Sequence, residues 1–432
     1  MKRVDKIYIK KKEYDIMITV DEVYPIDINT TIGPTGTIKR LFRNRDYFRE
    51  RGYEMTIFAC VPVKKRLLTY DYQLQEIVKL PEEKDSGIMA DTINAPGKKN
   101  QLKSKLKTLV ETNRFTSAAM LNRRSRENKK LISMYMAMKR SPDIVVFHEL
   151  DGCYNYHKMN NGRLNAKTAM FIHADGTDDG MFRKSHPSLV GTPAHRKLLK
   201  KLEFTYQRTD RIVFISELAR QRFCDAHPEY ALKAVSVVNG IDDMAPVENA
   251  VPSSDYKYRL VSTGSVCKRK GQYLVVEAMH RMSPEVLKDT HFTIIGTGPD
   301  YSELQGVVEE YGLKEHVTFA GNKPNKEIHC LLARENIYIL MSNNEGLPIS
   351  ILEAMRAGLP VISTRVAGIP EEVDSRNGEL VYPDVDQLTE VLNRLPEYDW
   401  GALGRNSRNR FEEEFTFARM REKYAALFDG MK

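Results

Sequence analysis

Short apolar runs rich in β-branched residues recur along the chain and alternate with longer segments of helical periodicity. This alternation is typical of α/β domains built on parallel sheets. The strands expected in the first half are 16–20, 55–61, 144–147, 169–173, 211–215 and 235–238. Those expected in the second half are 259–263, 292–295, 317–320, 337–341, 361–364 and 379–382. Two such sets predict two doubly wound domains.

A chain of 432 residues is too long for one core, and a polar stretch at 242–255 separates the two sets of strands. We therefore expect an N-terminal domain at 1–240, a linker at 241–257 and a C-terminal domain at 258–411. Residues 412–432 have a helical pattern of their own.

A long insertion at 62–140 interrupts the first set of strands. Within it, Leu102, Leu106, Leu109 and Val110 repeat at helical spacing, so one face of the expected helix is apolar and its flanks are basic. Two interpretations stay open. Such a helix can lie on a membrane surface, or it can pack on its own domain with a solvated basic face.

The formal net charge of +8 is unevenly distributed. Residues 1–250 carry 44 Lys and Arg against 31 Asp and Glu, whereas residues 251–432 carry 22 against 27. Within 98–140 there are 13 basic residues and two acidic ones. This excess indicates an anionic partner, either membrane headgroups or nucleic acid. That region holds only two aromatic residues, Phe115 and Tyr135, so stacking platforms are scarce and nucleic acid is not expected.

The sequence contains no apolar run long enough to cross a bilayer, and its first residues lack the apolar core of a secretory signal. The five cysteines are scattered and form no Cys-x-x-Cys pair, which fits reduced thiols. We expect a cytoplasmic protein with no metal site.

The most informative segment is 344–364, in which Glu345 and Glu353 stand eight positions apart. Pro348 suits the first position of a helix, and Gly358 suits the left-handed position after its end. Glu345 is then in a loop and Glu353 inside the helix. Free N–H groups at such a helix start bind anions or sugar hydroxyls. These groups are expected at Gly346, Leu347, Ile349 and Ser350.

Three glycine turns follow expected strands, at 31–37, 264–271 and 295–299. Glycine lets the backbone approach a ligand closely, and open α/β sheets bind ligands at the carboxyl ends of their strands. Two further strands end in a histidine, His148 and His173. A single histidine in that position is more often structural than catalytic.

Taken together, the Glu-x7-Glu segment and the loop at 366–372 resemble the retaining glycosyltransferases of family four. The resemblance covers roughly 205–385 and is patchy before that. It implies the GT-B fold, in which two Rossmann-like domains face a central cleft. It also implies that the helix at 412–432 crosses back to the N-terminal domain.

The resemblance further implies transfer of a sugar from a nucleotide-diphosphate sugar, UDP- or GDP-linked, to an envelope glycan or lipid-linked acceptor. Anomeric configuration would be retained, and neither metal nor another cofactor would be needed. Such a protein would be cytoplasmic, or peripheral on the inner face of the membrane through its basic insertion.

Site residues follow from the same resemblance. The residues expected at the reacting centre are His173, preferred over His148, with Glu345 and Lys270. Glu353 would hold the ribose, Asn322 would lie beside the base, and Lys270 with Lys268 or Arg269 would neutralise the diphosphate. The donor-binding residues are therefore Gly33, Gly36, Lys268, Arg269, Lys270, Gly298, Asn322, Gly346, Leu347, Ile349 and Glu353.

One position departs from the family. Ser265 stands where family members carry an arginine, and a diphosphate leaving group needs cationic neutralisation. A catalytically weak binding or partner subunit is therefore an alternative function. A GT-B epimerase or phosphorylase is another, although neither is expected to show the Glu-x7-Glu segment.

Overall fold

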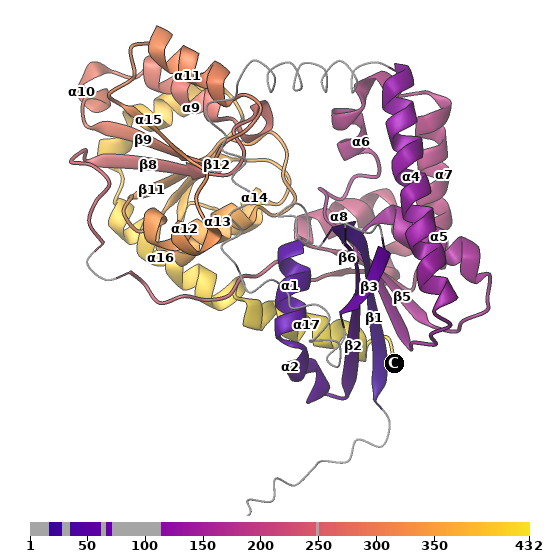
Figure 1. Cartoon of the computed structure of the whole chain (residues 1–432). Helices are drawn as coiled ribbons and strands as arrows, with labels where there is room; N and C mark the ends of the chain where they lie inside the picture. Colours follow the sequence, from indigo (N-terminus) through magenta and orange to yellow (C-terminus); the bar gives the residue numbers. More distant parts are fainter. Residues whose placement is uncertain (1–16, 28–34, 62–65, 71–113, 248–249) are drawn as a thin grey trace, which may run out of the picture.

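The computed structural model describes residues 17–27, 35–61, 66–70, 114–247 and 250–432. Within these residues the chain forms two α/β domains, each with a central sheet flanked by helices (Figure 1). Gly33 and the amphipathic segment expected around 102–110 lie outside the described residues.

The N-terminal sheet has seven strands in the order β3-β2-β1-β4-β5-β6-β7. All neighbours are parallel except β3, which pairs antiparallel with β2 at the edge. The strands are β1 (Ile18–Asp27), β2 (Tyr53–Val61), β3 (Arg66–Tyr70), β4 (Ile144–Phe147), β5 (Lys167–Ile172), β6 (Arg211–Phe214) and β7 (Ala234–Ser236). The helices are α1 (Thr35–Arg43), α2 (Arg45–Arg49), α4 (Arg114–Ala137), α5 (Leu150–Asn160), α6 (Gly180–Ser185), α7 (Pro193–Arg208) and α8 (Glu217–Ala226).

The C-terminal sheet has six parallel strands in the order β10-β9-β8-β11-β12-β13. They are β8 (Tyr258–Thr263), β9 (Thr290–Ile295), β10 (Val317–Gly321), β11 (Ile337–Leu340), β12 (Val361–Thr364) and β13 (Gly378–Val381). The helices are α9 (Gln272–His280), α10 (Pro284–Leu287), α11 (Tyr301–Glu310), α12 (Asn325–Leu332), α13 (Ile349–Arg356), α14 (Ile369–Glu372), α15 (Val385–Asn393) and α16 (Trp400–Glu414). This is the order of a Rossmann sheet, whose switch point lies between β8 and β11.

All twelve expected strands are present, and β4 and β12 match to the residue. The sheet interior explains this agreement, because parallel strands covered on both faces are apolar throughout. Every residue of β4, β11 and β12 is buried. The edge strand β3 and the long helix α4, both inside the insertion, were not predicted.

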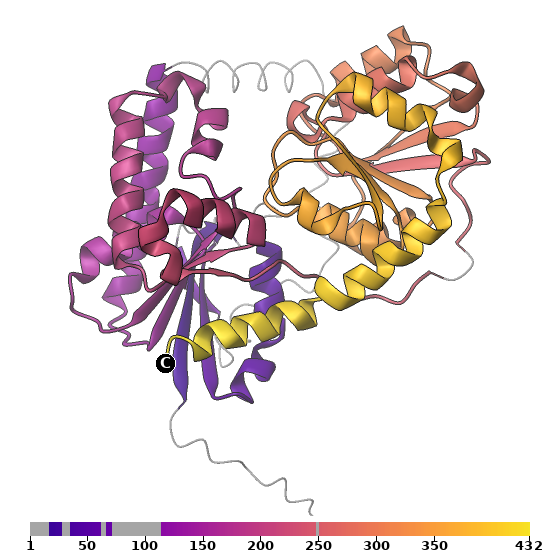
Figure 2. The same cartoon turned by 180° about the vertical axis from the view of Figure 1, so that it is seen from behind.

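Helices cover both faces of the N-terminal sheet. One face packs against α1, α2 and the last helix, α17 (Phe417–Asp429), and the other against α4, α5 and α7. The chain leaves the C-terminal domain through α16 and enters α17 on the N-terminal domain, as the yellow helices in Figure 2 show. Tyr424 of α17 stacks on Phe171, with ring centroids 4.9 Å apart.

The crossing point between the domains is closely packed. The helix expected at 412–432 is in fact two, because α16 continues to Glu414 and α17 starts after Thr416, whose side chain caps it. Thr416 also forms a β-bridge with Ile241. A side chain on Gly240 would come within 2.4 Å of the Thr416 carbonyl oxygen, so only glycine fits there.

Candidate active site

The loop after β11 carries Glu345, whose carboxylate is held by three neighbours. Ser342 Oγ donates to Glu345 Oε1 at 2.9 Å. Arg269 Nη1 and Lys270 Nζ reach the same oxygen at 2.6 and 2.8 Å. The side chains of Lys270 and Glu345 are only 12% and 11% exposed, whereas Arg269 is 46% exposed. The two cations Arg269 and Lys270 therefore meet the Glu345 carboxylate at the C-terminal ends of the strands of this sheet.

The position of these cations depends on a tight turn after β8. Lys268–Lys270 form one 3₁₀ turn that ends at Gly271 with φ +70°. A side chain at Gly271 would come within 1.9 Å of the Met341 carbonyl oxygen, so glycine lets this turn press against the end of β11. Asn343 N–H donates to the Arg269 carbonyl oxygen at 3.0 Å, which fastens the turn to the Glu345 loop.

Glu353 lies one helix turn inside α13. The helix begins at Ile349, and Pro348 occupies the capping position before it, with ψ 112°. The helix start expected at Pro348 was therefore one residue early. Burial raises the pKa of Glu353, and the positive charges of Arg356, Arg40 and Lys270 oppose this rise. Lys270 therefore faces both glutamates of the Glu-x7-Glu segment.

A third acidic side chain, Glu372 at the end of α14, lies behind this cluster and was missed by the sequence analysis. It is fully buried, and neither carboxyl oxygen has a hydrogen-bond partner in the described structure. Burial raises its pKa well above the usual value, and the negative charges of Glu345 and Glu371 add to the effect. Burial therefore favours the neutral form of Glu372.

The N-terminal domain meets the Glu345 loop directly. A Cβ atom on Gly346 would lie 3.0 Å from both the His173 carbonyl oxygen and Ile215 Cδ1, so the loop packs on the ends of β5 and β6. On its other side, a Cβ atom on Gly368 would lie 2.2 Å from the Gly346 carbonyl oxygen. Glycine at 346 therefore lets the two domains approach closely at this point.

His173 is the last member of a hydrogen-bonded chain of three side chains, of which Glu22 and His148 are buried and His173 is partly exposed. Its Nε2 lies 3.1 Å from His148 Nδ1, and His148 Nε2 lies 2.9 Å from Glu22 Oε2. Burial, and then the neighbouring His148, lowers the pKa of His173 to about 3. His173 is therefore neutral at physiological pH. The two histidines expected to compete for one role are instead partners.

A second contact between the domains is made by Glu371 of α14. Its carboxylate accepts hydrogen bonds from Ser216 Oγ at 2.6 Å and from the backbone N–H groups of Glu217 and Leu218 at 2.7 and 2.5 Å. These groups form the start of α8, so a carboxylate from the C-terminal domain caps a helix of the N-terminal domain.

The structure places the remaining expected residues less centrally. Lys268 donates its backbone N–H to Asp300 at 2.7 Å, and within the described structure it forms no ion pair with Glu345. Gly298 packs on Ser265 and Val266, where any side chain would clash. Gly36 in the first turn of α1 and Asn322 after β10 are exposed. The Leu347 side chain is in the core, and Ile349 begins α13, so at these two positions only the backbone is available to a ligand.

Glu22 could have been found from the sequence by one signal. Asp21 and Glu22 are adjacent acidic residues within the apolar run of β1, and buried acidic residues are rare unless they are paired. In the structure Asp21 forms a bidentate pair with Arg140, and Glu22 bonds to His148.

Potential metal ligands do not cluster in the part of the chain that the structure describes. Among residues 17–27, 35–61, 66–70, 114–247 and 250–432, no group of three or more His, Cys, Asp or Glu side chains is placed to hold a metal ion. In the acidic loop after His173, Asp178 and Asp179 instead accept hydrogen bonds from His227 and His195.

Comparison with protein families finds a match to the C-terminal domain. Residues 247–414, which carry Arg269, Lys270, Glu345, Glu353 and Glu372, match the model described as "Glycosyl transferases group 1". The C-terminal domain belongs to this family.

Curated proteins similar to this chain include the putative colanic acid biosynthesis glycosyltransferase WcaL of Salmonella typhimurium. It is 27% identical over 246 residues, which cover 55% of this chain and 56% of WcaL. A GDP-mannose-dependent alpha-(1-6)-phosphatidylinositol monomannoside mannosyltransferase of Mycolicibacterium smegmatis is 31% identical over 202 residues, covering 43% of this chain and 53% of the mannosyltransferase. The chain thus spans about half the length of the curated relatives it matches.

Among solved structures, Anabaena Alr3699/HepE in complex with UDP superposes with a TM-score of 0.63 at 15% identity. The match covers 96% of this chain and all of HepE. The two Rossmann-like domains therefore have the GT-B fold, which confirms the fold expected from the sequence.

Proposed function

We propose that this protein transfers a sugar from a nucleotide-diphosphate sugar to an envelope glycan or lipid-linked acceptor, retaining anomeric configuration and using no metal. The supporting observation is the convergence of Arg269, Lys270 and Glu345 at the carboxyl edge of the C-terminal sheet, next to His173 of the N-terminal domain. This geometry offers cations for a leaving diphosphate and a carboxylate for sugar hydroxyls at the same point.

Lys270 and Arg269 are the cations that would neutralise the leaving diphosphate. Because Ser265 replaces the family arginine, a second positive charge must come from elsewhere on the turn. Arg269 supplies it, since its guanidinium already reaches the Glu345 carboxylate, whereas Lys268 forms no such pair within the described residues. On donor binding, the diphosphate would compete with Glu345 for these two cations, which frees the carboxylate to bind the sugar.

Glu353 would accept hydrogen bonds from the ribose hydroxyls. Burial raises its pKa, and the positive charge of Lys270, the residue proposed to hold the diphosphate, acts on it. Two cations on the turn would do the work of a metal ion in balancing the diphosphate charge. The acceptor would enter from the N-terminal domain, beside His173.

The choice of acceptor rests on the relatives. WcaL is named for colanic acid biosynthesis, and the mycobacterial enzyme for a phosphatidylinositol mannoside. An envelope glycan or a lipid-linked glycan is therefore the proposed acceptor class, and a UDP- or GDP-sugar the proposed donor.

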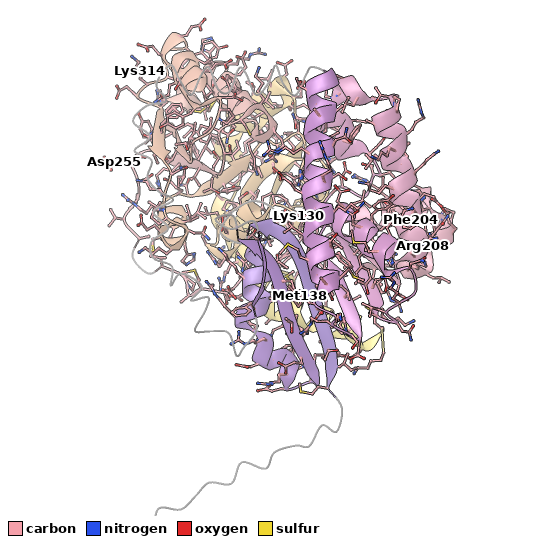
Figure 3. The ribbon with its side chains drawn as sticks, turned by 45° about the vertical axis from the view of Figure 1, so that its right-hand side comes forward. Lys130, Met138, Phe204, Arg208, Asp255 and Lys314 are labelled. Atoms are coloured by element: carbon pink, nitrogen blue, oxygen red, sulfur yellow. The ribbon has the colours of Figure 1, made fainter. Side chains whose placement is uncertain are left out.

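An anionic membrane surface is the proposed partner of the outer face of the N-terminal domain. The helix α4 carries six basic residues and one acidic residue, and α7 carries five and one. Figure 3 shows Lys130 of α4 and Arg208 of α7 on this outer face. A groove of about 480 Å³ between α5 and α7 is lined by Lys158, Arg196, Lys197, Lys200 and Lys201, with aromatic rings from Tyr154 and Phe204.

Each basic residue held near an anionic bilayer contributes about 1 kcal/mol to binding. None of the helices that the structure describes is both long and apolar enough to span a bilayer. Membrane contact would therefore be peripheral, on the inner face.

The variant Lys197→Glu/Lys200→Glu should lose most of its binding to phosphatidylserine vesicles at 0.1 M salt. The matched charge reversal Lys314→Glu, on the other domain in Figure 3, should leave binding unchanged. Equal binding by both variants would reject this face as the membrane contact.

The catalytic proposal is tested by nucleotide release from a panel of UDP-, GDP- and ADP-sugars with lipid-linked acceptors. Lys270→Ala should lower kcat by about 10²–10³, the usual loss when one group that stabilises developing charge is removed. Lys268→Ala, on the same turn, is the matched control and should retain turnover. If both variants match the wild type, the diphosphate does not bind at this turn. A wild-type protein that binds donors without turnover would favour the alternative of a binding or partner subunit.

A further inference from the structure

Glu22, His148 and His173 lie on three adjacent strands of the N-terminal sheet. Glu22 is in β1, while His148 and His173 directly follow β4 and β5, and β4 pairs with both β1 and β5. The side chains of Glu22 and His148 are fully buried. His148 also stacks on Phe171, with ring centroids 4.7 Å apart. The chain of hydrogen bonds therefore has a fixed geometry and crosses the carboxyl edge of the sheet to the cleft.

The number of protons shared by Glu22, His148 and His173 decides which nitrogen of His173 carries hydrogen. If Glu22 is ionised and His148 protonated, His148 has hydrogen on both nitrogens and donates from Nδ1 to His173 Nε2. If Glu22 is protonated, it donates to His148 Nε2, and neutral His148 again donates from Nδ1. In both arrangements Glu22 and His148 carry no net charge together, and His173 holds its hydrogen on Nδ1.

The third arrangement has an ionised Glu22 beside a neutral His148 whose hydrogen is on Nε2. Only this arrangement would place the hydrogen of His173 on Nε2. It leaves a net negative charge in a fully buried site, which is costly without a compensating cation. The nearby Arg140 is already paired with Asp21 by two hydrogen bonds. Glu22 Oε1 has no hydrogen-bond partner in the described structure, which makes the uncompensated charge costlier still.

His173 is partly exposed and lies beside the Glu345 loop. Its Nε2 is occupied by His148, and its carbonyl oxygen faces Gly346. Nδ1 is therefore the ring nitrogen that can meet a bound donor. With hydrogen on Nδ1, the neutral ring can donate to a sugar oxygen but has no lone pair there to accept a proton.

We infer that Glu22 and His148 are positioning residues that keep the hydrogen of His173 on Nδ1, so that His173 meets an oxygen of the donor sugar as a hydrogen-bond donor and not as a base. This inference rests on the proposed function for its substrate, but the placement of the hydrogen can be measured without turnover. The proton of the acceptor must then leave by another route than His173.

The placement is tested by ¹⁵N NMR of the whole protein with labelled histidines, using His173→Gln to assign the His173 signals. At pH 7.5 His173 should show a protonated Nδ1 and an unprotonated Nε2. In His148→Phe, which keeps the stacked ring but removes the hydrogen bond, the His173 signals should shift toward a mixture of both forms. A protonated Nε2 in the wild type, or identical His173 signals in the variant, would overturn the inference.

The catalytic consequence is tested with a matched pair of variants. His148→Phe should lower kcat about tenfold, the size of one oriented hydrogen bond of about 1.4 kcal/mol, with little change in the KM for the donor. His291→Phe is the control, because His291 is also buried, stacks on Tyr256 and bonds to Thr318, but belongs to the C-terminal domain. It should leave kcat unchanged.

Equal kcat values for the two variants would overturn the positioning role. If no donor in the panel supports turnover, the proposed function fails, while the NMR measurement still decides where the hydrogen of His173 lies.

Discussion

Replacing Glu372 with leucine should stabilise this protein, although most substitutions in a protein core are destabilising. Glu372 is fully buried, and both carboxyl oxygens lack hydrogen-bond partners in the described structure. A buried polar group without partners costs about 1–3 kcal/mol in proteins, and leucine of similar size adds apolar burial at the same place. We therefore expect Glu372→Leu to raise the free energy of unfolding by about 1–3 kcal/mol near pH 4.5, where ionisation contributes little. For a domain of this size, 2 kcal/mol corresponds to a rise in Tm of roughly 4–8 °C.

The effect should grow with pH. The pKa of Glu372 is raised well above 4.5 in the native protein. At pH 4 the carboxyl group is protonated in the native and the unfolded chain alike, so ionisation does not change stability. Above 4.5 the unfolded chain ionises while the native protein does not, and native stability falls by about 1.4 kcal/mol per pH unit until the native pKa is passed. The advantage of Glu372→Leu should therefore be larger at pH 8 than at pH 5.

Denaturation curves at pH 5, 6.5 and 8 measure this difference, with Glu335→Leu as the control. Glu335 is also nearly buried and its pKa is also raised, but its Oε2 accepts a hydrogen bond from Ser253 at 2.8 Å. Removing it loses this hydrogen bond, so the control should not be stabilised as Glu372→Leu is. A Glu372→Leu variant that is less stable than the wild type at pH 8, or whose advantage does not change with pH, would refute the reasoning.

Three further predictions concern the cleft. Glu353→Ala should weaken binding of the nucleotide by about tenfold in calorimetry without lowering Tm, because one charged hydrogen-bond acceptor is lost; unchanged affinity would reject its ribose role. Gly346→Ala should reduce kcat, since its Cβ would press on the His173 carbonyl oxygen at 3.0 Å and hold the domains apart. Glu371→Ala should remove a helix cap of about 0.5–2 kcal/mol and shift X-ray scattering toward a more open form, whereas Glu413→Ala should not.

Much of the fold could be predicted because its strands are buried on both faces. β4 (IVVF) is an apolar run with polar flanks, and β12 (VIST) is rich in β-branched residues; both patterns are typical of short buried strands. The edge strand β3 has a mixed sequence, RLLTY, in which only pairing with β2 decides the conformation. The helix α4 has its charged residues spread around its circumference, so its periodicity gives little sign of a helix.

The candidate site was predicted where its residues share one local segment. Lys270, Glu345 and Glu353 were expected because the glycine turn and the Glu-x7-Glu segment that carry them resemble those of the family. Glu22 and Glu372 depend instead on contacts between elements far apart in the chain. Nothing local distinguishes Glu372 from the solvated residue expected at the end of a short helix; only the packing of α14 under the Glu345 loop buries it.

The state of Glu372 also affects the net charge of the proposed diphosphate site, where Ser265 stands in place of the family's arginine. Near the Glu345 loop, Arg269 and Lys270 bring two positive charges and Glu345 one negative charge. If Glu372 were ionised, the second negative charge would cancel the remaining positive one, and the turn would offer a diphosphate no net attraction. Because burial keeps Glu372 neutral, one positive charge remains before any ligand binds. A site with one arginine fewer can thus stay cationic, and Glu372→Gln, which is neutral at every pH, should bind donor as well as the wild type at pH 7. Much tighter donor binding by this variant would show instead that Glu372 is charged.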